Sequence, residues 1–196
     1  MKCVGLNMPF RQSSSSLTPS RYRSSSNVDA MVPVAMNPMA YLDMISEITP
    51  FLYLSGQNPV TANKLKIKGI THIINCAAES TSLPNIPGIT VTYLHVYDTP
   101  TERISQYFDS VADKIETVRL NGGRVLVHCI AGVSRSVTLL IAYLLKYRQM
   151  NLKEAFHHVR GKRPIISPNN GFWMQIIAYE RQLFGRTTVF MTQVSF

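Results

Sequence analysis

The stretch RVLVHCIAGVSRS, residues 124–136, determines which fold we expect for this chain of 196 residues. It begins with a short Val and Leu run that is typical of a buried strand, and residues 137–145 continue it as an apolar helix. The phosphate loop, residues 128–136, thus lies at a helix N-terminus, where unpaired N–H groups and the helix dipole attract anions. Gly132 lets the loop curl, so that its N–H groups can converge on one tetrahedral dianion.

Cys129 and Arg135 are the reactive side chains of this loop. A thiol near a helix N-terminus and a cation can have its pKa lowered from about 8.5 to roughly 3.5–7.5, so Cys129 is predicted to be a thiolate at neutral pH. Arg135 can reach back across the loop and hold two phosphate oxygens with its planar guanidinium, a geometry that a Lys lacks. The alternative is a buried structural Cys beside a surface Arg. The strand, the Gly and the Arg together favour an anion site with a nucleophile.

Apolar patterns on both sides of the loop predict one α/β domain over residues 45–185. The predicted strands are short, rich in Val and Ile, and bounded by Gly, Pro or Asn; they cover 51–54, 70–76, 91–96 and 125–127. Helical periodicities follow at 104–118, 137–145, 152–159 and after Pro168. We therefore expect a single domain with a central, mostly parallel β-sheet flanked by helices, in which the helix after the phosphate loop is buried.

Composition limits the other classes of protein that this chain can be. The length and the hydrophobic fraction of 45% suit one domain plus a tail, and no apolar run approaches the roughly 20 residues of a membrane span. The three cysteines have neither disulfide nor metal-ligand spacing, so we expect a reducing compartment and no metal site. We also expect no cofactor. The net charge of +9 attracts anionic partners, but no Lys and Arg run with interleaved aromatics predicts nucleic-acid binding.

The two ends of the chain are predicted to be tails. Residues 1–44 are rich in Ser, Pro and Met and lack sustained periodicity, so they cannot bury enough apolar area to become ordered. Residues 186–196 are predicted to be a C-terminal tail. Basic residues but no acidic ones precede Asp29, as in a mitochondrial transit peptide. We expect a cytoplasmic or nuclear location, with mitochondrial import as the alternative.

The phosphate loop matches the HC-x5-R-[ST] signature and thereby resembles the protein tyrosine phosphatase superfamily. With YLHVYDTP at 93–100 and RPIISPNNGF at 163–172, the sequence is similar to the small atypical dual-specificity phosphatases over nearly the whole predicted domain. This resemblance implies that Cys129 is the nucleophile and forms a phosphocysteine. It also implies that Arg135 binds phosphate and stabilises the transition state, and that Ser136 helps the thiolate to leave.

Asp98 is the predicted general acid, because a leaving alkoxide or phenoxide needs a proton. It follows a strand and precedes Thr99-Pro100, on a loop at the carboxyl end of the sheet where ligands of open α/β sheets bind. A lone Asp in a turn usually has a structural role, which is the alternative here. The resemblance implies instead that Asp98 protonates the leaving oxygen and then acts as the base that activates water. Asn169 resembles the family's brace for the phosphate loop and also suits a helix N-cap. His128 either supports the thiolate through hydrogen bonds or is a core histidine.

The remaining residues of the phosphate loop bear on the substrate. Phosphate is expected to bind the Arg135 side chain and the loop formed by Ile130, Ala131, Gly132, Val133 and Ser134. Phosphoinositide phosphatases that resemble this superfamily tend to carry additional basic side chains in this loop, and residues 130–134 include none. We also recognise no residues typical of an RNA 5′-triphosphatase loop. By resemblance, the pocket is shallow and accepts phosphotyrosine and phosphoserine or phosphothreonine. The expected partners are therefore phosphorylated proteins, with a non-protein phosphate ester (phosphoinositide or RNA 5′-phosphate) as the alternative.

A catalytically idle phosphate-binding module is the second functional hypothesis. The presence of Cys129, Arg135 and Asp98 counts against it, because binding alone needs neither a nucleophile nor an acid. Cys76, on a predicted strand, is expected to be a small core residue rather than a redox partner. Nothing in the sequence specifies an oligomeric state.

Overall fold

The computed structural model describes residues 37–80 and 85–193. Its strands are β1 (Ser46–Thr49), β2 (Leu52–Ser55), β3 (His72–Asn75), β4 (Thr90–Tyr93) and β5 (Val125–His128). Its α-helices are α1 (Ala62–Ile67), α2 (Phe108–Leu120), α3 (Arg135–Arg148), α4 (Leu152–Lys162) and α5 (Asn170–Phe184). Three 3-10 helices complete it: η1 (Pro38–Asp43), η2 (Ile104–Tyr107) and η3 (Met191–Gln193).

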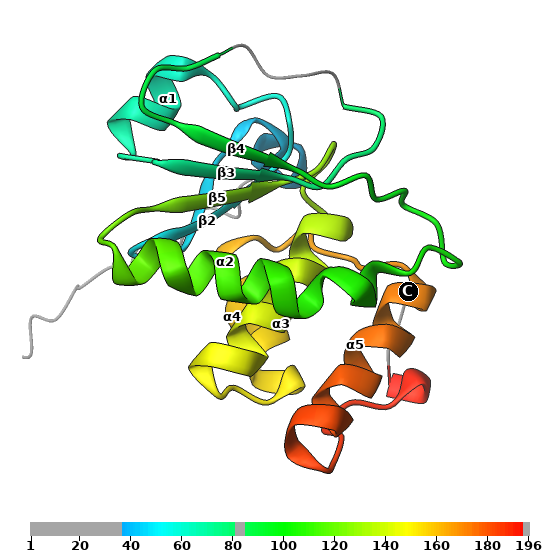
Figure 1. Cartoon of the computed structure of the whole chain (residues 1–196). Coiled ribbons are helices and arrows are strands. Elements are labelled where there is room, and N and C mark those ends of the chain that lie inside the picture. The colour runs from blue at the N-terminus through cyan, green and yellow to red at the C-terminus, as the bar shows by residue number, and fades with distance from the viewer. Residues whose placement is uncertain (1–36, 81–84, 194–196) are drawn as a thin grey trace, which may run out of the picture. The chain divides into compact units, whose positions relative to one another are not determined.

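The strands form one five-stranded sheet in the order β1-β2-β5-β3-β4. The pairs β2–β5, β5–β3 and β3–β4 are parallel, and only β1 is antiparallel to its neighbour β2. Helices α2 to α5 lie on one face of the sheet, and α1 lies on the other (Figure 1). The predicted α/β class and the mostly parallel sheet are confirmed. Since β5 occupies the middle of the sheet, the phosphate loop begins at the most enclosed strand.

Side chains of the central strands alternate between the two faces of the sheet. Leu54 and Val127 join the large core beneath helices α2 to α5. Tyr53, Ile73 and Leu126 point to the opposite face, where Leu65 of α1 covers them. This two-sided burial explains why these strands read as nearly continuous apolar runs, as parallel strands usually do.

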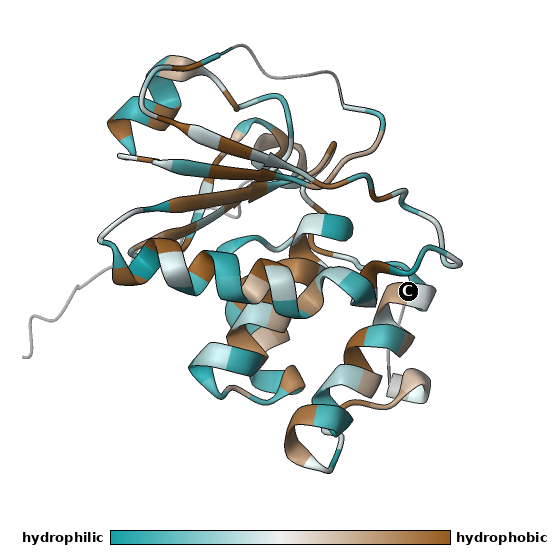
Figure 2. Ribbon diagram, viewed as in Figure 1, coloured by the Kyte–Doolittle hydropathy of each residue, from teal (hydrophilic) through white to brown (hydrophobic). Residues whose placement is uncertain are grey.

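Helix α3 is the central helix of the domain. All of its residues from Arg135 to Leu145 are buried, and it packs against α2, α4, α5, β2 and β5. Figure 2 shows the apolar residues concentrated on the strands and on the surfaces that the helices turn toward the core. The prediction of an enclosed helix after the phosphate loop is confirmed. Enclosure fixes the N-terminus of α3, and so fixes the loop that precedes it relative to the sheet.

Several elements differ from the sequence-based expectation. Strand β1 and helix α1 were not predicted, because neither is an apolar run: β1 has the sequence SEIT, and Leu65 is the one buried residue of α1. The predicted strand over 91–96 ends at Tyr93, and the helix expected from Ile104 begins as η2 before α2 takes over. The capping box of Asn151 and Glu154 is present. Helix α4 includes Gly161 and ends at Lys162, with Arg163 as its C-cap.

Both ends of the described chain make ordered contacts with the domain. Helix η1 precedes the boundary predicted at residue 45, and the backbone oxygens of Tyr41 and Met44 accept hydrogen bonds from Arg163. Beyond residue 185, the Thr188 N–H and hydroxyl both donate to Glu180. Residues 1–36 lie outside the described residues. Among the described helices, none is both long and apolar enough to span a membrane.

Candidate active site

The phosphate loop turns sharply between β5 and α3. Gly132 has a φ of 68°, in the left-handed region, and a Cβ there would collide with the backbone of Ser55. Only glycine meets both demands at this position. The Gly132 N–H points to the Cys129 sulfur, at an N···Sγ distance of 3.2 Å. The loop therefore curls around the thiol as its sequence predicts.

The carbonyl groups of residues 130–134 are all hydrogen-bonded to protein groups outside the curl. Arg163 donates to the carbonyl oxygens of Ala131 and Gly132, at 3.0 and 2.8 Å. The other donors are the N–H groups of Gln57 to Ile130 (2.8 Å), Ser167 to Val133 (2.9 Å) and Thr138 to Ser134 (3.0 Å). Because every carbonyl from 130 to 134 faces away from the thiol, the N–H side of the loop is available to an anion.

Cys129 is buried, with 1% of its surface exposed, and its pKa lies well below the usual range of a thiol. A hydrogen bond from Cys76 contributes most to this lowering, and burial acts in the opposite direction. Hydrogen bonds from the Ser136 hydroxyl and N–H and the charge of Arg135 lower the pKa further. The Ser136 oxygen is 3.3 Å from the sulfur. These interactions favour the thiolate, the form of cysteine that acts as a nucleophile.

Cys76 lies behind Cys129 and is fully buried in the core. Its thiol donates to the His128 carbonyl at 3.0 Å and is also within hydrogen-bond reach of the Cys129 sulfur. A thiol has one proton, so these two bonds are alternatives. An ionised Cys129 is a stronger acceptor than a neutral carbonyl, so it competes with His128 for this proton. Burial raises the pKa of Cys76, which keeps this thiol protonated as a donor.

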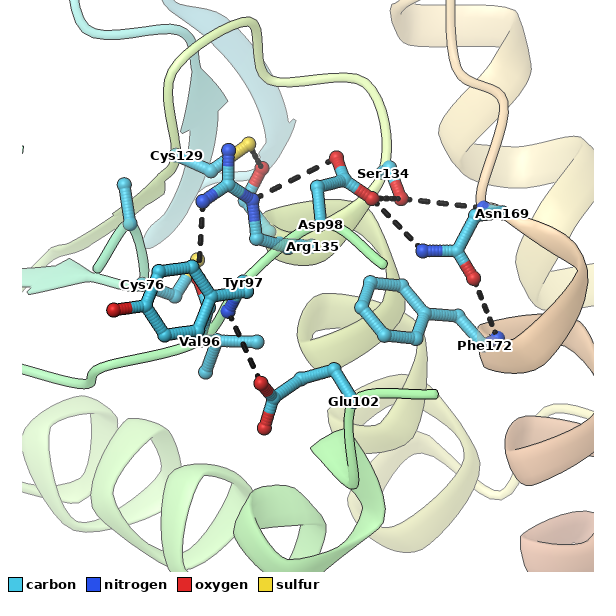
Figure 3. A network of polar contacts seen from close by, with 12 residues as sticks. Cys76, Val96, Tyr97, Asp98, Glu102, Cys129, Ser134, Arg135, Asn169 and Phe172 are labelled. Carbon is cyan, nitrogen blue, oxygen red and sulfur yellow. Dashed lines mark hydrogen bonds and ion pairs between the residues drawn. The ribbon is translucent and has the colours of Figure 1, made fainter. Parts of the chain in front are cut away.

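Arg135 is buried, and its guanidinium lies beside the Cys129 sulfur and faces the Asp98 carboxylate (Figure 3). Its Nη1 donates to Glu79 at 2.6 Å and to the Val96 carbonyl at 3.0 Å. Its Nε is 3.6 Å from Asp98 and has no hydrogen-bond partner among the described residues. A buried donor without a hydrogen-bond partner is costly, and here the Asp98 carboxylate compensates its charge without a hydrogen bond.

Asp98 lies opposite the thiolate with its side chain 35% exposed. One of its oxygens accepts hydrogen bonds from the Ser134 hydroxyl at 2.7 Å and the Asn169 amide at 2.9 Å. The other faces Arg135 Nε. Figure 3 shows Asp98 flanked by these three side chains, which come from the phosphate loop, α3 and the start of α5. The carboxyl group is thus held between the phosphate loop and the start of α5.

The acid loop, residues 97–102, is held in turn by α5. Gln175 donates to the Glu102 carbonyl at 2.8 Å. Gly171 packs directly against Pro100, and a Cβ at this glycine would overlap the Pro100 carbonyl. Helix α5 can therefore approach the acid loop only with glycine at this position.

Comparison with known proteins defines the family. Residues 52–182 match the family described as "Dual specificity phosphatase, catalytic domain". The chain belongs to the dual specificity phosphatase family. It is 47% identical over 156 residues to dual specificity protein phosphatase 14 of Homo sapiens, covering 78% of this chain and 77% of that protein. It is 46% identical over 150 residues to dual specificity protein phosphatase 18 of Bos taurus, covering 75% and 78%.

A solved structure gives the same assignment. The crystal structure of human DUSP28 superposes with a TM-score of 0.67 and 30% identity, covering 71% of this chain and 94% of that one. The resemblance and the fold predicted from the sequence are thus confirmed. As a dual specificity phosphatase, the chain is a cysteine-dependent hydrolase of phosphoric monoesters.

The structure brings together the site residues predicted for this phosphatase. Asn169 caps α5 by accepting from the Phe172 N–H at 3.0 Å, and its backbone N–H donates to the Ser134 hydroxyl at 3.2 Å. Its amide donates to Asp98, so the predicted brace also supports the acid. His128 contacts the Cys129 carbonyl at 3.3 Å through Nδ1, and its Nε2 is buried without a partner in the described chain. Burial lowers the pKa of His128, so this residue adds no charge beside the thiolate.

Sequence reasoning missed Glu79, Arg163 and Gly171. Glu79 follows β3 as a single acidic residue, and nothing local indicates its ion pair with Arg135, which is 56 positions away. Arg163 and Gly171 lie in the stretch that carries the family resemblance, but their contacts with the two loops are tertiary. Within residues 37–80 and 85–193, no group of three or more His, Cys, Asp and Glu side chains could hold a metal ion.

Proposed function

We propose that this phosphatase hydrolyses phosphotyrosine and phosphoserine or phosphothreonine in proteins by two in-line displacements on phosphorus. One observation carries the proposal: the thiol of Cys129, whose pKa is strongly lowered, lies in the same loop as Arg135, whose Nε has no hydrogen-bond partner among the described residues and is 3.6 Å from the Asp98 carboxylate. The nucleophile, the oxyanion donors and the acid thus surround one space in front of the phosphate loop.

In the first step, the Cys129 thiolate attacks phosphorus and the bond from phosphorus to the ester oxygen breaks. Asp98, in its protonated form, gives its proton to the leaving oxygen, so that an alcohol or phenol departs. Charge on the equatorial oxygens is taken up by the loop N–H groups and by Nε of Arg135. The product of this step is a phosphocysteine.

In the second step, a water oxygen attacks phosphorus and the bond from sulfur to phosphorus breaks. The Asp98 carboxylate removes a proton from the water, which regenerates the acid for the next turnover. Ser136, whose hydroxyl lies 3.3 Å from the sulfur, donates to the departing thiolate. The Cys76 thiol is a second donor to the same sulfur. Both donors stabilise the charge that returns to sulfur, so they act on this step more than on the first.

Phosphorylated proteins are the substrates that the surroundings of the loop favour. Ile130 and Tyr97 are 40% and 59% exposed at the rim, and they offer an apolar edge to a side chain of the substrate. Residues 130–134 contribute no cation for a multiply phosphorylated inositol headgroup. The idle-module alternative is less well supported, since a binding module would need neither the lowered pKa of Cys129 nor an acid aimed at the same space.

A reducing compartment suits this chemistry, because oxidation of the thiolate would stop it. Cys76 and Cys129 are both free thiols. We therefore propose a cytoplasmic or nuclear location. Mitochondrial import remains the alternative, since the basic segment that suggests it lies outside the described residues.

An activity panel tests the proposal. The full chain, in reducing buffer with EDTA, is given phosphotyrosine and phosphothreonine peptides, phosphoinositides and 5′-phosphorylated RNA. We expect turnover of both kinds of peptide, a burst of one product, and a trapped phosphocysteine on Cys129. Cys129→Ser should retain phosphate binding but lose turnover. Appreciable turnover by this variant would reject the covalent mechanism, and preferential turnover of lipid or RNA would reject the proposed substrate class.

A further inference from the structure

Arg163 is a fully buried cation behind the phosphate loop, where α4 ends. Its Nε and Nη2 donate to the carbonyl oxygens of Gly132 and Ala131, at 2.8 and 3.0 Å. On the opposite side, its Nη1 donates to the carbonyl oxygens of Tyr41 and Met44, at 2.7 and 3.2 Å. The side chain therefore joins the loop to the chain segment that precedes β1.

No carboxylate compensates this charge. Among the described residues, no Asp or Glu oxygen lies within ion-pair distance of the Arg163 guanidinium. All of its hydrogen-bond acceptors are neutral: four backbone carbonyls and the Ser46 hydroxyl. Burial lowers the pKa of Arg163 to about 10, and the nearby charge of the Cys129 thiolate acts in the opposite direction. A buried charge normally requires a partner, and the charges of Cys129 and Tyr41 oppose the effect of burial on Arg163.

The hydrogen bonds made by Arg163 also orient the loop. Each peptide unit that turns its carbonyl toward Arg163 turns its following N–H to the other side of the chain. The units fixed in this way carry the N–H groups of Gly132 and Val133, and the Gly132 N–H points to the Cys129 sulfur. A planar fork with several donors can hold two successive carbonyls at once, which a single ammonium group cannot.

We propose that Arg163 is a positioning residue of the phosphate loop. It fixes two successive loop carbonyls away from the thiolate, and it places a permanent positive charge behind the anion site. The carbonyls of Tyr41 and Met44 hold this guanidinium from outside, so η1 belongs to the support of the site although it precedes the predicted domain. The inference rests on the proposed function only in that the loop binds phosphate.

The test uses the full chain with Arg163→Lys and Arg163→Met, and Lys162→Met as the matched control. Lys162 is the exposed neighbour of Arg163, so its replacement removes the same charge without touching the loop. Two readouts need no turnover. The first is calorimetric titration with inorganic phosphate. The second is the ultraviolet absorbance of the thiolate against pH, taken as the difference from the same protein carrying Cys129→Ser.

Arg163→Met should weaken phosphate binding by roughly 100-fold and move the thiolate titration upward by about one pH unit, because an opposite charge near the sulfur is lost. Arg163→Lys keeps the charge but loses the fork, so we expect about tenfold weaker phosphate binding and a smaller shift of the titration. Lys162→Met should match the unmodified chain in both readouts. A residue that only stabilised the fold would change the melting temperature and leave both readouts of the folded protein unchanged.

The inference would be overturned if folded Arg163→Lys had the phosphate affinity and the thiolate titration of the unmodified chain. It would also be overturned if folded Arg163→Met matched Lys162→Met in both measurements. If Arg163→Met does not fold, Arg163→Lys decides alone. A chain that shows the Arg163 effects but hydrolyses no phosphopeptide would contradict the proposed function and support this inference. If the unmodified chain hydrolyses phosphopeptides but the Arg163 variants keep normal phosphate affinity and thiolate titration, the proposed function is supported and this inference is contradicted.

Discussion

The phosphate loop and the acid loop face each other across the site but are built in different ways. In the phosphate loop, Cys129 and Gly132 are buried, and every carbonyl from 130 to 134 has a partner. The acid loop is mostly exposed, and Asp98 is held by side chains that meet it from other elements. Changes in the first loop should therefore affect stability and activity together, whereas changes in the second should affect proton transfer with little cost to the fold.

Gly132→Ala is expected to have the largest effect. The left-handed backbone and the overlap of a Cβ with Ser55 together should cost about 2–5 kcal/mol of folding free energy. Activity should fall on the order of a thousandfold, because the loop N–H groups lose their alignment. Thermal unfolding and turnover of an aryl phosphate measure the two losses. Gly161→Ala is the control, since its added Cβ meets nothing within 4 Å and it lies in a helix. A Gly132→Ala variant as stable and active as this control would contradict our description of the loop.

Asp98→Ala should come next, and its effect should depend on the substrate. Turnover of an alkyl phosphate should fall by roughly 10²–10³-fold, since its oxygen leaves poorly without a proton, whereas an activated aryl phosphate should lose far less. The melting temperature should change little, because Asp98 is partly exposed. A plot of rate against the leaving-group pKa measures the difference. Equal losses for both substrates would remove Asp98 from the role of acid.

Asn169→Ala tests two roles of Asn169, as the N-cap of α5 and as a hydrogen-bond donor to Asp98. Losing the N-cap of α5 should cost about 1 kcal/mol, and losing the hydrogen bond to Asp98 should reduce turnover of poor leaving groups by up to about tenfold. Asn151→Ala is the matched control: Asn151 caps α4 in the same way, from outside the Asp98 hydrogen-bond network. Urea unfolding should give similar losses for both variants. If turnover also falls equally in both, the amide of Asn169 does not position the acid.

Glu79→Gln should have the smallest effect. Glu79 is 48% exposed, and solvent screens ion pairs of this kind, which are usually worth about 0–1 kcal/mol. The Val96 carbonyl still holds Nη1 of Arg135 in the variant. We therefore expect kcat/KM to change by less than about fivefold, with a smaller change at high salt. A loss of more than about fiftyfold would mean that Glu79 orients Arg135 as part of the phosphate site.

The pH dependence follows from the lowered pKa of Cys129. The thiolate is the reactive form, so kcat/KM should be retained at neutral pH and lost as pH falls through the pKa of Cys129. The lowered pKa of Cys129 moves this loss of activity to lower pH. A thiol with the usual pKa of about 8.5 would lose its reactive form as soon as the pH fell below that value. Cys76→Ala and Ser136→Ala each remove a donor to the sulfur, and each should move the acid limb of the profile to higher pH. A limb that stays in place would show that these donors do not stabilise the thiolate.

Much of the phosphate loop could be predicted from the sequence, because its determinants are close together in the chain. A strand, a glycine, an arginine six positions after a cysteine and an apolar helix fix the loop at the N-terminus of α3. The buried character of α3 also follows from its residues alone, since they are apolar on most sides. Strand β1 and helix α1 were missed because each contributes few apolar side chains: β1 is SEIT, and α1 buries Leu65 alone.

Local patterns in the chain were enough to predict the α/β class and the family, and they led to the proposal that Cys129, Arg135 and Asp98 carry the chemistry. The residues that surround these side chains follow from the folded arrangement alone: Glu79 on the guanidinium of Arg135, Cys76 bonded to the His128 carbonyl, and Arg163 between the loop and η1. The physical reason is the range of the interactions. Helix dipoles, turns and periodic burial act between neighbours in the chain, whereas a hydrogen bond that neutralises or orients a buried charge is made with whichever group the fold brings within 3 Å or so.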